Sequence, residues 1–278
     1  MSKITELVFP NSPELVDLPS QGKYYSLEHP LHEQSCVEII QMRAIEEDIL
    51  TNKDLLRREL AIDKLVQSIL IDERVKNEKN FLQLLVADQA AIVLKARISA
   101  YTWEYPVSIT CPKCGETVKF KFDLRKSSAQ NVVFQEDENV KYLEESNTFS
   151  ITIPDTQINV IVRPATIGTQ RKIKNKVLNK KKKELTNKEQ LEDLIVSING
   201  SSDVRIIDEF FKQIPAFYLS WFKAVLQDIN PRLSLLQEFT CENCGHIEDM
   251  EPPFTTDFLF TPKMKRGMKE SGTSSDSE

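Results

Sequence analysis

The sequence CPKCG at Cys111–Gly115 returns in almost the same form, CENCG, at Cys241–Gly245. Two thiolates three positions apart can bind one metal ion when the backbone folds tightly around it. A glycine after the second cysteine accepts the left-handed backbone that such a turn needs. Two of these knuckles supply four thiolates, the closed tetrahedral ligand set of a structural zinc site. We therefore predict one structural zinc ion. Its ligands would be Cys111, Cys114, Cys241 and Cys244.

The two knuckles lie far apart, because 126 residues separate Cys114 from Cys241, against roughly 15–20 in a compact zinc ribbon. Residues 105–110 and 117–122, on either side of the first knuckle, alternate in polarity as strands do. Residues 233–240 lead into the second knuckle. The pattern predicts two hairpins that meet at a shared metal ion, which is a split zinc ribbon.

The cysteines also allow other interpretations. A disulfide is disfavoured because nothing marks the chain as secreted, and thiols in the cytosol stay reduced. A thioredoxin-type redox pair stands where a strand enters a helix, whereas Cys114 leads into a strand-like segment. A zinc deaminase needs His-x-Glu upstream of its PCxxC, and none precedes Cys111. A redox pair and a metal-free ribbon stay open. His246 could replace one cysteine ligand, and Cys36 is interpreted as a small buried side chain.

The rest of the chain suggests a duplicated plan. Residues 37–44 and 158–165 each resemble a strand that ends near an arginine and leads into a helix. Apolar periodicity predicts helices after each strand and before each knuckle. They are expected at 45–51, 54–70 and 80–101, and again at 166–184, 187–199, 203–213 and 215–228. We infer an α+β fold, mostly helical, with two pseudo-repeated halves (strand, helical bundle, β-hairpin knuckle) joined by the split four-cysteine zinc ribbon.

The corresponding domain boundaries define two halves and two ends. Prolines and weak periodicity predict an extended N-terminal arm, and the serine-rich C-terminus predicts a disordered tail. The predicted units are residues 1–35 (arm), 36–128 (first half), 129–262 (second half) and 263–278 (tail). The apolar stretch 252–260 either docks on its own domain or is offered to a partner.

Composition excludes several classes of protein. The chain has 278 residues, of which 40% are hydrophobic and 28% charged, with a formal net charge of −6. No apolar run approaches the roughly 18 residues of a membrane span, and no secretory signal or common phosphate-binding loop is visible. We expect a protein of a reducing cytoplasm, without membrane association. The negative charge argues against a general DNA-coating role.

No catalytic set can be recognised, so we expect a protein that is not an enzyme. Glu46–Asp48 would stand in the first turn of a helix, where carboxylates favour the dipole. His29 and His32 lie in a loop with Pro30, and we expect both to be solvated. The aromatic residues between Phe210 and Phe222 recur at helical spacing and are predicted to be core.

Residues 171–188 form a basic segment with nine lysines and arginines and one acid. Such a segment could contact phosphate or an acidic protein surface. It lacks interleaved aromatic residues for stacking on bases. A solvated helix face or an electrostatic docking site is therefore favoured over nucleic-acid recognition.

Several stretches together resemble the baseplate hub proteins of T-even-type contractile-tailed bacteriophages. They are Phe9–Pro13, Leu18–Tyr25, Met42–Thr51, the two CxxCG knuckles and Phe254–Phe258. The resemblance implies a viral tail protein that acts in assembly of the baseplate hub, as a structural subunit or an assembly factor. It implies other phage baseplate or hub proteins as partners, host cytoplasm during assembly, and the virion tail as a further location. Self-association stays open. The alternative is a nucleic-acid-binding zinc-ribbon protein that uses residues 171–188.

Overall fold

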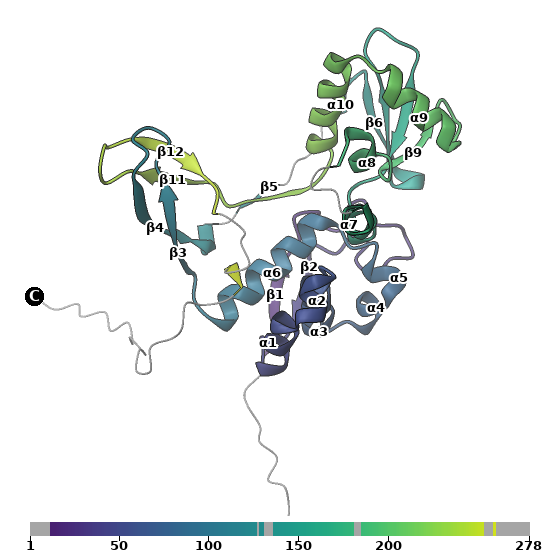
Figure 1. Ribbon diagram of the computed structural model, residues 1–278. Coiled ribbons are helices and arrows are strands. Elements are labelled where there is room, and N and C mark those ends of the chain that lie inside the picture. The colour runs from purple at the N-terminus through teal and green to yellow at the C-terminus, as the bar shows by residue number, and fades with distance from the viewer. Residues whose placement is uncertain (1–11, 127, 131–135, 181–184, 253–257, 260–278) are drawn as a thin grey trace, which may run out of the picture.

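The computed structural model describes residues 12–126, 128–130, 136–180, 185–252 and 258–259. The fold is α+β, with more residues in helices than in strands. Figure 1 shows three parts: a helical lobe built from residues 12–100, a second lobe with a sheet and helices, and a β-ribbon. The base of the ribbon packs into the core of the helical lobe through Tyr105 and Phe122. Two large hydrophobic clusters fill the lobes, and a small one fills the ribbon.

The helical lobe surrounds one buried helix. Strands β1 (Glu14–Asp17) and β2 (Cys36–Ile39) pair in antiparallel fashion. The helices that follow are α1 (Ala44–Thr51), α2 (Lys53–Arg57), α3 (Ala61–Ile69), α4 (Glu73–Lys76), α5 (Glu78–Phe81) and α6 (Val86–Ala100). Helix α6 buries residues on most of its faces, as a helix in the middle of a core does. Helix α1 begins with a capping box between Arg43 and Glu46, so Glu46 has the expected role at a helix start.

The expectation of an extended arm over residues 1–35 is wrong for residues 14–35, which pack into the helical lobe. Leu18, Tyr25 and Leu31 are buried in its core. Prolines and missing periodicity led to the error, since an irregular segment can be anchored by single side chains. His29 is also buried, contrary to expectation. It stacks on Tyr25, and its Nε2 lies 3.1 Å from the carbonyl oxygen of Asn80.

The second lobe contains a four-stranded antiparallel sheet of order β6-β7-β8-β9. Its strands are β6 (Val140–Leu143), β7 (Thr148–Thr152), β8 (Asn159–Val162) and β9 (Ile195–Ile198), with the short 3₁₀ helix η2 (Glu144–Ser146) after β6. The helices are α7 (Ile167–Lys180), α8 (Asn187–Leu191), α9 (Val204–Gln213) and α10 (Ala216–Asp228).

Two predictions for the second lobe need correction. The helix expected over 187–199 ends at Leu191, and residues 195–198 form β9 instead. Their sequence, Ile-Val-Ser-Ile, is rich in the β-branched residues that favour strands. Phe210 and Phe222 belong to the core as expected, but Phe217 is 77% exposed. Helical spacing alone did not show that the first turn of α10 projects beyond the core.

The ribbon consists of two hairpins, one that precedes the second lobe in the sequence and one that follows it. Strands β3 (Glu104–Thr110) and β4 (Thr117–Asp123) form the first hairpin, and β11 (Gln237–Thr240) and β12 (Ile247–Met250) form the second. The first hairpin matches the predicted strands. The 3₁₀ helix η1 (Leu124–Lys126) follows β4, and a short sheet of β5 (Ser128–Gln130) and β10 (Arg232–Ser234) connects the ribbon with the second lobe.

The end of the described chain returns to the helical lobe. Phe258 and Leu259 are buried in that core, and the buried Arg97 donates a hydrogen bond of 2.8 Å to the carbonyl oxygen of Phe258. Phe258 and Leu259 therefore dock on the protein itself, in the helical lobe. The sequence analysis had assigned them to the second half, residues 129–262. Residues 263–278, predicted to be a tail, lie outside the described residues.

Several contacts join the lobes directly, among them backbone hydrogen bonds between residues 82–86 and residues 165–168. The ring of Tyr24 packs on Tyr142 and Phe149 of the second lobe, with centroids 5.1 and 5.3 Å away. Arg171 on α7 donates a hydrogen bond to Asp63 on α3 at 2.6 Å and another to Glu78. The lobes are therefore fixed to each other independently of the ribbon.

Candidate metal centre

Both knuckles have the same backbone structure at the tip of a hairpin. In the first, Gly115 N–H donates to the carbonyl oxygen of Cys111, and Cys111 N–H donates to that of Glu116. The second repeats both bonds, between Gly245 and Cys241 and from Cys241 to the carbonyl of His246. Gly115 and Gly245 have φ angles of +74° and +68°. A Cβ at either position would meet no atom within 4 Å, so the left-handed backbone, and not crowding, favours glycine there.

The four cysteine sulfurs predicted from the sequence come together, all within 4.8 Å of one another. The Sγ atoms of Cys111 and Cys244 are 3.7 Å apart, and those of Cys114 and Cys241 are 3.8 Å apart. Four sulfurs at about 2.3 Å from a central zinc ion would be about 3.8 Å from each other. The four cysteines could therefore bind one metal ion. None of them forms a disulfide, and Cys36 lies in β2, outside the group.

The ribbon buries two of the four cysteines and leaves the other two open to solvent. Cys111 and Cys241 are buried against Phe239, while Cys114 is partly exposed and Cys244 is exposed. The side-chain amide of Asn243 donates to the Cys114 sulfur at 3.8 Å. His246, considered as a substitute ligand, pairs with Glu248 instead, at 3.3 Å.

The thiols of the group differ in acidity. The backbone N–H of Glu116, with help from Asn243, lowers the pKa of Cys114 to about 6. A backbone hydrogen bond at His246 lowers the pKa of Cys244, but desolvation and the neighbouring thiols outweigh it and raise that pKa to about 12. Four thiols this close cannot all ionise without a cation, since like charges at such distances repel each other. The donor set thus fits a thiophilic metal ion.

The surroundings of the knuckles disfavour the redox alternative. Each CxxC lies between two antiparallel strands, whereas a thioredoxin-type pair needs a strand entering a helix. Among the described residues, the four cysteines are the side chains whose ligand atoms lie close enough together to hold a metal ion.

The acids at the start of the first helix have a structural role, as Glu46 shows. Glu46 is buried and accepts hydrogen bonds from Arg43 and Ser68.

Most of the basic segment that the structure describes is neutralised within the protein. Lys176 bonds to Glu192 and Asp193, and Lys188 bonds to Asp208. Arg171 forms the contact between the lobes. The expected solvated face is therefore wrong for these three side chains. Lys181–Lys183 lie outside the described residues. The paired lysines offer little free charge to a nucleic acid.

The buried polar contacts of the helical lobe were not apparent from the sequence. Asp88 accepts hydrogen bonds from the Ser20 backbone, the Ser20 hydroxyl and the Tyr25 hydroxyl, at 2.9, 2.6 and 2.7 Å. Burial raises the pKa of Asp88 despite these bonds. The one sign of these contacts in the sequence is Asp88 itself, an acid at the start of an otherwise apolar helix segment. Its partners could not be identified, because they lie more than 60 residues away.

The fold and the cysteine group define a two-lobed protein whose ribbon can hold one metal ion and whose described residues show no catalytic constellation. Residues 14–259 match the family model described as T4 bacteriophage base plate protein, and the chain belongs to that family. No curated protein and no solved structure matches the chain significantly.

Family membership identifies a phage baseplate protein, a structural component that interacts with other phage baseplate proteins in the virion tail. It also agrees with a role that is not enzymatic. Within the described residues, no helix combines the length and apolar character that crossing a membrane requires.

Proposed function

We propose that this protein acts, without catalysis, in the assembly of the baseplate hub, either as a hub subunit or as an assembly factor. Its place of action would be the host cytoplasm during assembly. The observation that carries the proposal is the family match over residues 14–259. A ribbon made of two distant hairpins supports it, because the site has four protein ligands and no position for a substrate.

We further propose that the metal ion is zinc, bound by the four cysteine thiolates. Zinc prefers tetrahedral thiolate sites, and the sulfur distances of 3.7 and 3.8 Å suit its size. When bound, zinc supplies a cross-link between the hairpin that precedes the second lobe in the sequence and the hairpin that follows it. The protein's own residues would supply the surfaces that neighbouring subunits bind.

The proposed duplication has support in the order of the strands. Strand β2 pairs with β1 on one side. On its other side it forms a bridge with Leu70, which follows helices α1 to α3 in the chain. Strand β8 pairs with β7 on one side and with β9 on the other, after helices α7 and α8. All these pairings are antiparallel. Helices α4 to α6 and a knuckle follow in the first half, and helices α9 and α10 and a knuckle follow in the second, so the order of elements is similar in both halves.

Co-expression with the other hub proteins of the same phage tests the proposed function. The tagged full-length chain should capture at least one hub protein, and the complex should persist through size-exclusion chromatography. A chain that is folded, as judged by a cooperative thermal transition, yet captures none of them would contradict a role in the hub. Metal analysis of the same preparation should give one zinc ion per chain.

A further inference from the structure

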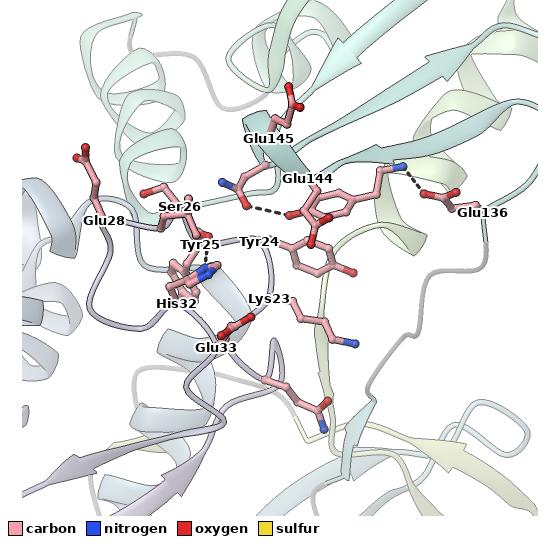
Figure 2. A pocket seen from close by; sticks show the side chains of 15 residues that line it. Lys23, Tyr24, Tyr25, Ser26, Glu28, His32, Glu33, Glu136, Glu144 and Glu145 are labelled. Atoms are coloured by element: carbon pink, nitrogen blue, oxygen red, sulfur yellow. Dashed lines mark hydrogen bonds between the residues drawn. The ribbon is translucent and has the colours of Figure 1, made fainter.

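A groove of about 1110 Å³ lies where the two lobes meet. Residues 21–33 of the helical lobe form one wall, and residues 136–147 of the second lobe form the other. Figure 2 shows Lys23, Tyr24 and Glu33 on one side, and Glu136, Glu144 and Glu145 on the facing side. The volume exceeds the 300–1,000 Å³ typical of small-molecule pockets, and the groove is open to solvent, so it suits a peptide segment better than a small ligand.

The groove offers apolar contacts at its base and edge. The rings of Tyr24 and Tyr142 meet edge to face and are only partly buried. Leu27 at the edge is 85% exposed, the highest value among the large hydrophobic side chains of the described residues. A partner with a large apolar side chain would cover both features at once.

The rim of the groove is acidic. It carries five glutamates and a single lysine, Lys23; the glutamates are Glu28, Glu33, Glu136, Glu144 and Glu145. None of the five forms an ion pair with a described residue. Other surface acids are paired, as Asp72 is with Arg74 and Asp203 with Arg205, whereas these five lie together around one groove. The groove therefore carries a net negative charge that its described residues leave unneutralised, and a cationic partner would neutralise it.

Both walls are held in place before any partner binds. The Tyr25 hydroxyl is fixed by Asp88 and by the backbone of Leu85. On the other wall, the Tyr142 hydroxyl donates to Asn147 at 2.8 Å. A groove with fixed walls loses little conformational entropy when it is occupied, which favours binding.

We propose that this groove binds a lysine- and arginine-rich segment of another baseplate protein, with one large apolar side chain seated against Tyr24, Tyr142 and Leu27. The charges of the rim and the segment are complementary, which speeds association and selects the partner. The identity of the partner as a baseplate protein rests on the proposed function, but the chemistry of the bound segment does not.

Peptide binding to the full-length chain tests the proposal. The probe is a fluorescein-labelled 12-residue peptide with a central Leu-Trp pair flanked by lysines and arginines, and its counterpart carries glutamates at the basic positions. Fluorescence anisotropy should show binding of the basic peptide alone. The affinity should fall at least tenfold between 50 and 500 mM salt, because exposed charges are screened.

Two triple variants locate the binding site. The groove variant carries Glu33→Gln, Glu144→Gln and Glu145→Gln. The control variant removes three exposed charges elsewhere, by Glu38→Gln, Glu238→Gln and Asp249→Asn. Both should keep the wild-type melting temperature within a few degrees. The groove variant should bind at least tenfold more weakly and the control less than threefold. Equal losses in both variants, or no binding by the wild-type chain, would overturn the proposal.

The co-expression assay separates this proposal from the proposed function. If the wild-type chain captures hub proteins and the groove variant does not, the groove is the docking site. If the groove variant captures them as well as the wild type does, the groove proposal is wrong and the role in the hub stands. Peptide binding without capture of any hub protein would instead refute the role in the hub.

Discussion

Replacement of Cys114 by serine should remove the metal ion and unfold the ribbon. Serine keeps the size of the side chain but replaces the thiolate that zinc prefers. Near the knuckles the buried core consists of Cys111, Phe239 and Cys241 and cannot compensate, although Tyr105 and Phe122 anchor the base of the ribbon in the helical lobe. A fully buried phenylalanine contributes about 3 kcal/mol at most, whereas structural zinc sites in small domains contribute about 10–16 kcal/mol.

A second estimate comes from loop closure. The metal ion would cross-link positions 126 residues apart, between Cys114 and Cys241. A disulfide that closes a loop of about 100 residues stabilises a fold by about 4–5 kcal/mol, because it lowers the conformational entropy of the unfolded chain. By analogy, we expect a similar contribution from this cross-link. We therefore expect Cys114→Ser to lower the free energy of unfolding by at least about 4 kcal/mol.

The assay combines metal content, thermal unfolding and hydrogen exchange. Wild-type protein should contain one zinc ion per chain, and Cys114→Ser should contain almost none. Amides of β3, β4, β11 and β12 should lose their protection, while those of α6 and the four-stranded sheet should keep it. Cys36→Ser is the matched control, because Cys36 lies in β2, away from the group. Retention of zinc by Cys114→Ser, or an unchanged melting temperature, would refute a structural metal ion.

Three further substitutions test the rest of the fold. Arg171→Met should lower the free energy of unfolding by about 3 kcal/mol in urea denaturation, because the buried carboxylate of Asp63 loses its cationic partner and keeps only the hydrogen bond from Gln89. Gly22→Ala should destabilise by several kcal/mol in the same assay, since φ is +74° and a Cβ would overlap the backbone of the facing turn. His29→Gln should flatten the fall in melting temperature between pH 7 and 5. Burial lowers the pKa of His29, so its stability contribution is present above the unfolded pKa of about 6.5 and is lost as pH falls through the folded value.

Each of these predictions has a control. Arg205→Met breaks an exposed pair with Asp203 and should leave the urea midpoint almost unchanged, because exposed ion pairs contribute little to stability. Gly200→Ala shares a positive φ, of +79°, but its Cβ would meet no atom within 4 Å, so it should cost only about 1 kcal/mol. His32→Gln, in the same loop, serves as the control for His29→Gln. Equal effects in a substitution and its control would contradict the corresponding contact.

The parts of the fold that the sequence predicted are those that local patterns determine. The knuckle at Cys111–Gly115 combines a three-residue thiol spacing, a glycine and alternating flanks, and each feature acts within a few residues. Helices α1, α9 and α10 also follow from local periodicity and caps, with bounds close to those expected. The gathering of four thiols was predicted from chemistry, because each knuckle alone is an incomplete ligand set.

The parts that the sequence did not predict depend on contacts between distant segments. The packing of residues 14–35 rests on single anchors such as Ser20, whose partner Asp88 is 68 residues away. The pair of Arg171 with Asp63 spans 108 residues and turns a basic segment into a contact between lobes. The inter-lobe groove is lined by two segments more than 100 residues apart, with Tyr24 packed against Tyr142, so no pattern within one segment could indicate it.

The contacts between the parts of the molecule have different consequences. Tyr24 and Arg171 join the lobes directly, and both lie outside the ribbon. The cysteine group joins only the two hairpins, at the ends of the segment that contains the second lobe. Loss of metal should therefore release the ribbon while the groove between the lobes keeps its shape. Cys114→Ser should then abolish zinc binding but leave the affinity for the basic peptide within about twofold, and a parallel loss of both would show that the ribbon shapes the groove.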